Sequence, residues 1–266
     1  MPNTRPPAVA GSFYPADANT LAADVRALLA SPAASDLTPK ALIVPHAGYM
    51  YSGPVAASAY ASLRTIASRI RRVILLGPTH RVPVHGMALP DADTFSTPLG
   101  PVALDTDAMR AIADLPQITV SAQAHAFEHA LEVQLPFLQI ALNDFTLLPL
   151  AVGDARTEDV AEVLLRLWGG TETLIVISSD LSHYLPYEVS RLVDQKTAQD
   201  ILALRPGITH DEACGATPVN GLLLAARRHH LTPHLLDLRN SGDTAGPRDG
   251  VVGYAAFAFC EENGHE

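Results

Sequence analysis

Short aliphatic runs alternate along this chain with longer amphipathic or alanine-rich segments. The aliphatic runs predict buried strands at residues 41–44, 73–76, 145–152, 174–177, 232–238 and 251–259. The longer segments predict helices at residues 53–63, 158–168, 190–204 and 219–228. Continuous apolar strands separated by helices are typical of parallel sheets that are covered on both faces. The pattern therefore predicts an α/β fold with a mostly parallel central sheet flanked by helices.

The region between residues 87 and 104 is less regular than the rest of the chain. It carries Pro90, Pro98 and Pro101, and we expect it to form a hairpin or a lid. The sequence contains no internal repeat, low-complexity segment or long linker that would separate domains. A length of 266 residues is within the range of one-domain α/β proteins. We therefore expect a single domain over residues 1–266.

Composition narrows the class of protein and its partners. Hydrophobic residues make up 48% of the chain and charged residues 17%, as in compact globular proteins. The net charge is −10 and basic residues form no run, whereas recognition of nucleic acid needs clustered cations. No apolar stretch is long enough for a membrane helix, the N-terminus lacks a signal-peptide pattern, and two cysteines form no disulfide framework. We expect a cytoplasmic protein that binds neither nucleic acid nor membranes.

Three of the predicted strands end in polar residues just past the last aliphatic position. His46 follows the first strand, His80 follows the second, and Asp180 and His183 follow the run at 174–177. Because ligands bind outside the carboxyl ends of strands in open α/β sheets, we expect these side chains to converge. Imidazoles with a carboxylate are typical of open catalytic metal sites. For each histidine alone, the alternative is a hydrogen-bonded loop residue.

Asp180 and His183 are three residues apart and would share one face if a helical turn begins there. Asp180 is then expected to orient an imidazole or to bind a metal, with capping of the turn as the alternative. His183 is expected to donate or accept protons, because the ordinary pKa of histidine lies near neutrality.

The segment from residue 125 to residue 136 contains a second pair with this spacing. His129 and Glu132 would share one face of a predicted helix, as a base with its orienter or as a brace behind metal ligands. A solvated helix face is the alternative. His125 and Glu128 are expected to be exposed. Farther along the chain, Cys214 lies among small residues before a helix, and we expect it to pack rather than to react.

Asp243 is the only carboxylate in the polar segment 240–244, which follows the strand predicted at 232–238. A turn at Gly242 is the ordinary interpretation, and a third metal ligand is the alternative. The sequence has no P-loop, no GxGxxG after a strand, no HExxH and no GxSxG. These absences argue against a nucleotide-dependent enzyme or a common hydrolase.

Seven segments, taken in order, resemble the Memo-like family, which is found in many prokaryotes as the B component of the AmmeMemoRadiSam set. They are AGSFY at 10–14, PHAGY at 45–49, GPTH at 77–80, EHALEVQLP at 128–136, SSDLSH at 178–183, CG at 214–215 and GYAA at 253–256. The family is similar in fold to the class III extradiol ring-cleaving dioxygenases, which hold non-haem Fe(II) with two histidines and a carboxylate.

The resemblance implies that His46 and His80 bind a metal, with Asp180 and His183 in the same cavity and His183 near the acid/base position. The implied metal is Fe(II), with copper or zinc as alternatives.

The resemblance also bears on the third ligand. Eukaryotic members have a cysteine as third ligand after the last-but-one strand, whereas this chain has Thr244 there with Asp243 beside it. Asp243 would complete a set of two histidines and one carboxylate.

Two classes of function follow from these features. The first is a metal-dependent oxidoreductase that acts on an unknown small molecule or peptide. The name of the set implies association with a radical SAM protein and an AMMECR-type partner. The second is a binding module without turnover, for a peptide, an anion or a metal, because eukaryotic relatives are associated with phosphopeptide binding. A metallohydrolase that uses Zn²⁺ and His183 is a third option, since the ligand set does not fix the metal.

Overall fold

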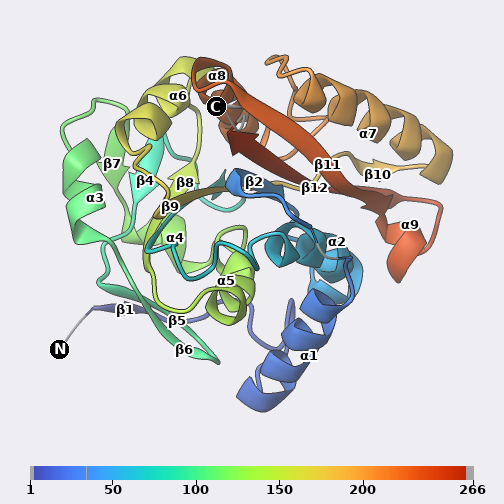
Figure 1. The fold of residues 1–266 in the computed structure, drawn as a ribbon, viewed down its shortest axis with the longest axis horizontal. Helices are drawn as coiled ribbons and strands as arrows, with labels where there is room; N and C mark the ends of the chain where they lie inside the picture. The colour runs from blue at the N-terminus through green and yellow to red at the C-terminus, as the bar shows by residue number, and fades with distance from the viewer. Residues whose placement is uncertain (1–2, 34, 262–266) are drawn as a thin grey trace.

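The computed structural model of this chain describes residues 3–33 and 35–261, so the ends of the domain expected at 1–266 lie outside it. A nine-stranded sheet crosses the molecule with helices on both faces, and a separate three-stranded sheet lies to one side (Figure 1). The α/β fold class is therefore confirmed. None of the helices in the described residues has the length and apolar character that crossing a bilayer requires.

Four adjacent parallel strands form the centre of the large sheet. In spatial order they are β2 (Pro39–Val44), β9 (Thr173–Ser178), β3 (Arg72–Pro78) and β8 (Thr146–Val152). Nearly every residue of these strands is buried, as expected for a sheet covered on both faces. The carboxyl ends of all four point to the same edge of the sheet, which is where the polar residues of the sequence pattern gather.

Antiparallel pairing takes over on both sides of this centre, so the sheet is mixed. On one side β12 (Val251–Glu261) pairs antiparallel with β2, with β11 (Leu231–Asn240) and with the short β10 (His183–Leu185). On the other side β4 (Met87–Leu89) pairs antiparallel with β8 and parallel with β7 (Ile118–Val120). The parallel arrangement predicted from the sequence therefore describes the centre of the sheet.

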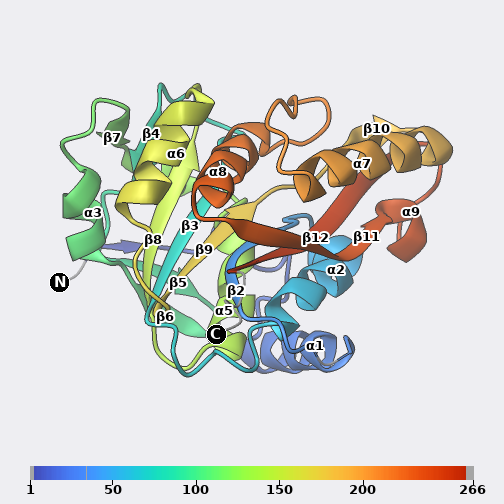
Figure 2. The same ribbon diagram turned by 45° about the horizontal axis from the view of Figure 1, so that its top comes forward.

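Side chains of each strand alternate between two hydrophobic cores, one on each face of the sheet. In β2, Leu42 and Val44 point into one core, and Ala41 and Ile43 into the other. The first core is covered by α1 (Ala18–Ala30), α2 (Tyr49–Ala61) and α5 (Leu135–Ala141). The second is covered by α6 (Thr157–Arg166), α7 (Tyr187–Leu202) and α8 (Ala216–Arg228) (Figure 2).

The irregular region after β4 forms a hairpin. Of the two expectations for this region, a hairpin or a lid, the first is confirmed. The hairpin consists of β5 (Thr94–Thr97) and β6 (Gly100–Ala103), and β1 (Thr4–Arg5) lies parallel to β5. The remaining short helices are α3 (Thr106–Ile112), α4 (Ala122–Ala126), the 3-10 helix η1 (Glu132–Gln134) and α9 (Ser241–Thr244). The pairing of β1 with β5 brings the start of the chain close to the loop that follows α4.

Candidate metal centre

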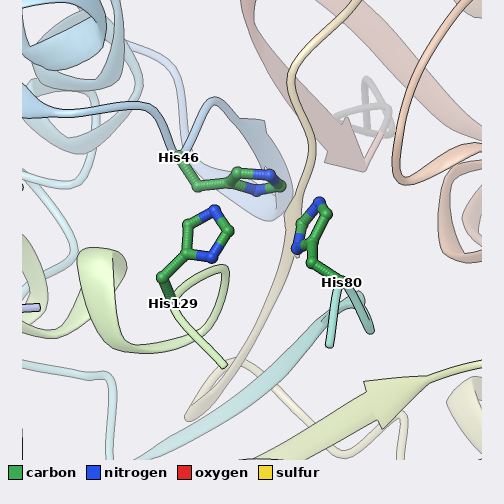
Figure 3. A group of neighbouring side chains, drawn as sticks. All are labelled: His46, His80 and His129. Carbon is green, nitrogen blue, oxygen red and sulfur yellow. The ribbon is translucent and has the colours of Figure 1, made fainter. Parts of the chain in front are cut away.

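Three imidazoles meet at the carboxyl edge of the sheet. One candidate ligand atom from each of His46, His80 and His129 lies within 4.8 Å of the other two. The rings of His80 and His129 stack with centroids 4.6 Å apart, and the His46 ring lies edge-on to both (Figure 3). His46 follows β2 and His80 follows β3, so the predicted convergence of these two residues is confirmed.

Hydrogen bonds determine which nitrogen two of the imidazoles can offer. The Ser178 hydroxyl donates to the carbonyl of Ala130 (2.6 Å), so its oxygen accepts from Nδ1 of His46 (2.9 Å). Nδ1 of His80 donates to the Glu128 carboxylate (2.9 Å). With Nδ1 protonated in both rings, Nε2 carries the lone pair that a metal ion needs.

Burial keeps His46 and His129 neutral. It lowers the pKa of His46 to about 3, with a further contribution from His80, and the pKa of His129 to about 4, with a further contribution from His46. Neutral imidazole is the form that binds metals. Nδ1 of His129 is buried and makes no hydrogen bond among the described residues, and it lies 3.4 Å from a carboxylate oxygen of Glu128. Three neutral or neutralisable imidazoles beside one carboxylate fit a bound cation.

Glu128 holds His80 and the start of the following loop in place by hydrogen bonds. Its carboxylate accepts from the backbone N–H of His80 (2.6 Å), from the His80 ring and from the backbone N–H of Ala130 (2.9 Å). Burial, the largest single cause, would raise the pKa of Glu128, but the hydrogen bonds from His80 and Ala130 together with the electrostatic attraction of His80 outweigh it and lower the pKa to about 2. The expectation that Glu128 and His125 are exposed is wrong. Each is 2% exposed, and the His125 ring is hydrogen-bonded to the carbonyl of Ala88.

Asp180 and His183 lie beside the triad, but not on a helical turn. Residues 181 and 182 exchange backbone hydrogen bonds with Gly253, and His183 begins β10. The prediction of a helical turn there is therefore wrong, because this segment pairs with β12 as a strand. Asp180 accepts from the backbone N–H of His46 (2.7 Å), and burial raises the pKa of its carboxyl. The ring of the half-buried His183 is hydrogen-bonded to the carbonyl of Leu181 (2.8 Å).

Glu132 does not pair with His129 as the spacing predicted. His129 lies in the loop before η1, so the two residues are not on one face of a helix. The carboxylate of Glu132 is fully buried and accepts from Arg5 and Tyr14 instead.

Asp243 is not brought to the triad either. It lies in the first turn of α9 and accepts from the backbone N–H of Asn240 (3.0 Å) and from the hydroxyl of Tyr187. The carboxylate is thus used to cap a short helix on the surface. The third residue of the cluster is His129.

The sequence pattern predicts that Cys214 packs rather than reacts, and it does not place this residue beside His46. Its sulfur lies 3.3 Å from Nε2 of His46, and the residue directly precedes α8. Burial raises the pKa of the Cys214 thiol to about 12, with a further contribution from Asp180, so the thiol is protonated and can donate to the imidazole. A Cβ at Gly215 would lie 2.6 Å from the Cβ of Ser179, so only glycine allows this approach. The Cys-Gly pair before a helix was the available signal.

Comparison with known proteins agrees with this architecture. Residues 5–258 match the family model described as Memo-like protein. A MEMO1 family protein of Aquifex aeolicus is 35% identical, covering 96% of this chain and 98% of its own. A MEMO1 family protein of Aeropyrum pernix is 34% identical, covering 95% and 98%. A crystal structure of an Escherichia coli K12 protein shares the fold at 14% identity, with a TM-score of 0.53 over 82% of this chain and 98% of its own. This chain therefore belongs to the Memo-like family.

Proposed function

We propose that the triad of His46, His80 and His129 binds Fe(II), with copper or zinc as alternative metals, and that the protein is a metal-dependent oxidoreductase. The observation that carries the proposal is the set of three converging imidazoles. His46 and His80 each offer Nε2. Three protein ligands leave coordination positions open, and an iron ion held in this way supplies Lewis-acid and one-electron chemistry.

The neighbouring side chains have distinct tasks in this proposal. Asp180 fixes the backbone of His46, and Glu128 fixes both the backbone and the ring of His80. Once a bound metal ion displaces the proton of its thiol, Cys214 would offer a soft sulfur donor next to His46, which favours a transition metal over Mg²⁺ or Ca²⁺. His183 is half-buried at the edge of the site, and we assign it the transfer of protons to and from a substrate.

The biological setting of the proposal follows from the family resemblance. We infer an unknown small molecule or peptide as substrate, and a radical SAM protein and an AMMECR-type protein as partners in the cytoplasm. A binding module that holds a ligand in this pocket without turnover is the alternative.

Metal analysis of three proteins tests the proposal. We would purify the wild type, His129→Ala and the control His85→Ala anaerobically without a chelating tag and measure their metals by mass spectrometry. The side chain of His85 is 98% exposed, so its loss leaves the triad intact. We expect about one iron per chain in the wild type and in the control, and a loss of about tenfold or more in His129→Ala, because one ligand of three is removed. Zinc in place of iron would favour hydrolysis. The absence of metal even after reconstitution would overturn the proposal.

A further inference from the structure

Arg5 connects the start of the chain to the loop that carries His129. Its guanidinium is buried, and Nε donates to the carbonyl of His125 (2.7 Å). One terminal nitrogen donates to the carbonyl of Glu128 (2.7 Å), and the other to the carboxylate of Glu132 (2.6 Å). A single side chain therefore contacts both ends and the middle of the segment 125–132.

The carboxylate of Glu132 collects further donors from the N-terminal segment. It accepts from the backbone N–H groups of Ala8 (2.7 Å) and Val9 (3.0 Å), and from the hydroxyl of Tyr14 (2.6 Å). Together with Arg5, four donors meet one carboxylate that has no exposed surface. Such charge-assisted bonds are stronger than neutral ones, so they hold residues 5–14 against the loop.

The N-terminal segment and the loop 125–132 both contact residues of the triad. Within the N-terminal segment, the ring of Phe13 lies against His129, with centroids 4.8 Å apart, and the carbonyl of Phe13 accepts from the backbone N–H of Tyr49 (2.8 Å). Within the loop, Glu128 is bonded to the backbone and to the ring of His80. The position of the loop thus sets two of the three imidazoles.

We propose that Arg5 and Glu132 are positioning residues of the metal site, and that the N-terminal segment 5–14 is one of its walls. Neither side chain is among the three imidazoles that would bind the ion; they act through Glu128, His129 and Phe13. The inference rests on the proposed function in that it takes the triad to bind a metal.

Cobalt binding by Arg5→Met and a matched control tests this role. The control is Arg72→Met, which breaks the Arg72–Asp105 pair, also 2.6 Å long but at the opposite end of β3 from His80. We expect Arg5→Met to bind Co²⁺ about 10- to 100-fold more weakly than the wild type and to shift its visible absorption bands, because side chains behind metal ligands have effects of this size. Arg5→Lys keeps the charge and should recover part of the affinity. Arg72→Met should leave affinity and spectrum unchanged.

Amide hydrogen exchange of the metal-free proteins gives a readout that does not depend on the metal. Residues 125–132 should exchange faster in Arg5→Met than in Arg72→Met. If the wild type binds no Co²⁺, the proposed function fails, and the exchange experiment alone decides the role of Arg5. If Arg5→Met does not fold, Arg5→Lys takes its place, because one ammonium cannot reproduce three separate contacts. An Arg5 variant that keeps the cobalt affinity, the absorption spectrum and the amide exchange rates of the wild type would overturn the proposal.

Discussion

Two buried carboxylates hold the two loops that line the candidate metal centre, and they differ in what balances their charge. Glu132 fixes the loop of His129 and is paired with the guanidinium of Arg5 at 2.6 Å. Asp194, on α7, fixes the segment before His183 by accepting from the backbone N–H of Ser182 (3.1 Å), and it also accepts from the hydroxyl of Ser190 on its own helix (2.8 Å). No cation in the described part of the chain forms an ion pair with Asp194.

The loop of His129 is therefore held by a buried carboxylate that is paired with a cation. The segment before His183 is held by a buried carboxylate that has no cation as partner in the residues that the structure describes. Burial raises the pKa of Asp194, and the hydrogen bonds from Ser190 and Ser182 offset only part of that effect. A buried charge without a partner costs stability, whereas removing the partner of a paired one costs more. We therefore expect the loop held by Glu132 to be rigid and intolerant of substitution. The segment that carries His183, the residue assigned to proton transfer, should be less rigid and should tolerate substitution better.

The largest expected effect compares the two charges directly. Arg5→Met leaves the carboxylate of Glu132 buried without its cation, and we expect a loss of about 3–5 kcal/mol in the free energy of unfolding. Asp194→Asn removes a charge that has no cation and keeps an oxygen that can accept from Ser182, so we expect a change below about 1 kcal/mol. Urea unfolding of the metal-free proteins measures both. Equal losses in the two variants would show that the loop and the segment are held in the same way.

A smaller effect probes the packing around Asp194. A Cβ at Gly253 would lie 2.2 Å from a carboxylate oxygen of Asp194, so Gly253→Ala must displace this side chain. We expect a loss of about 1–3 kcal/mol, typical of overpacked sites. Gly250→Ala, just before the start of β12, is the matched control, since a Cβ there meets no atom nearer than 3.8 Å. Thermal unfolding compares the two variants, and equal melting temperatures would contradict the tight contact.

The sequence predicted the sheet and two of the three imidazoles because these features are local. An aliphatic run followed by a polar residue specifies both a buried strand and the position of His46 or His80 at its end. The contributions of His129, Cys214 and Arg5 depend on contacts between segments that are far apart in the chain. Arg5 meets Glu132 across 127 positions, for example, and no periodicity in the sequence reports such a pairing.

The same reasoning explains two of the site predictions that the structure corrected. A spacing of three residues suggested that His129 and Glu132 share a helix face, but the helix begins only at residue 132. Asp243 follows a strand, as His46 and His80 do, and this strand, β11, runs in the same direction as β2, because both pair antiparallel with β12. β11 lies beyond β12, however, and hydrogen bonds from Asn240 and Tyr187 hold Asp243 in α9. The order of the strands, which the sequence pattern does not reveal, decided the outcome.

The smallest expected effect is a pH dependence that separates the two carboxylates. A carboxyl group whose pKa is raised in the folded state binds its proton more tightly there than in the unfolded chain. Its contribution to stability is therefore present at low pH and is lost as the pH rises through the raised pKa of Asp194. Asp194→Asn should abolish this loss, so its free energy of unfolding should depend less on pH, from the ordinary pKa of an aspartate upwards, than that of the wild type. Asp154→Asn is the control, because the Asp154 side chain is 90% exposed. Parallel pH profiles for the wild type and Asp194→Asn would mean that the segment before His183 is not held by an unpaired charge.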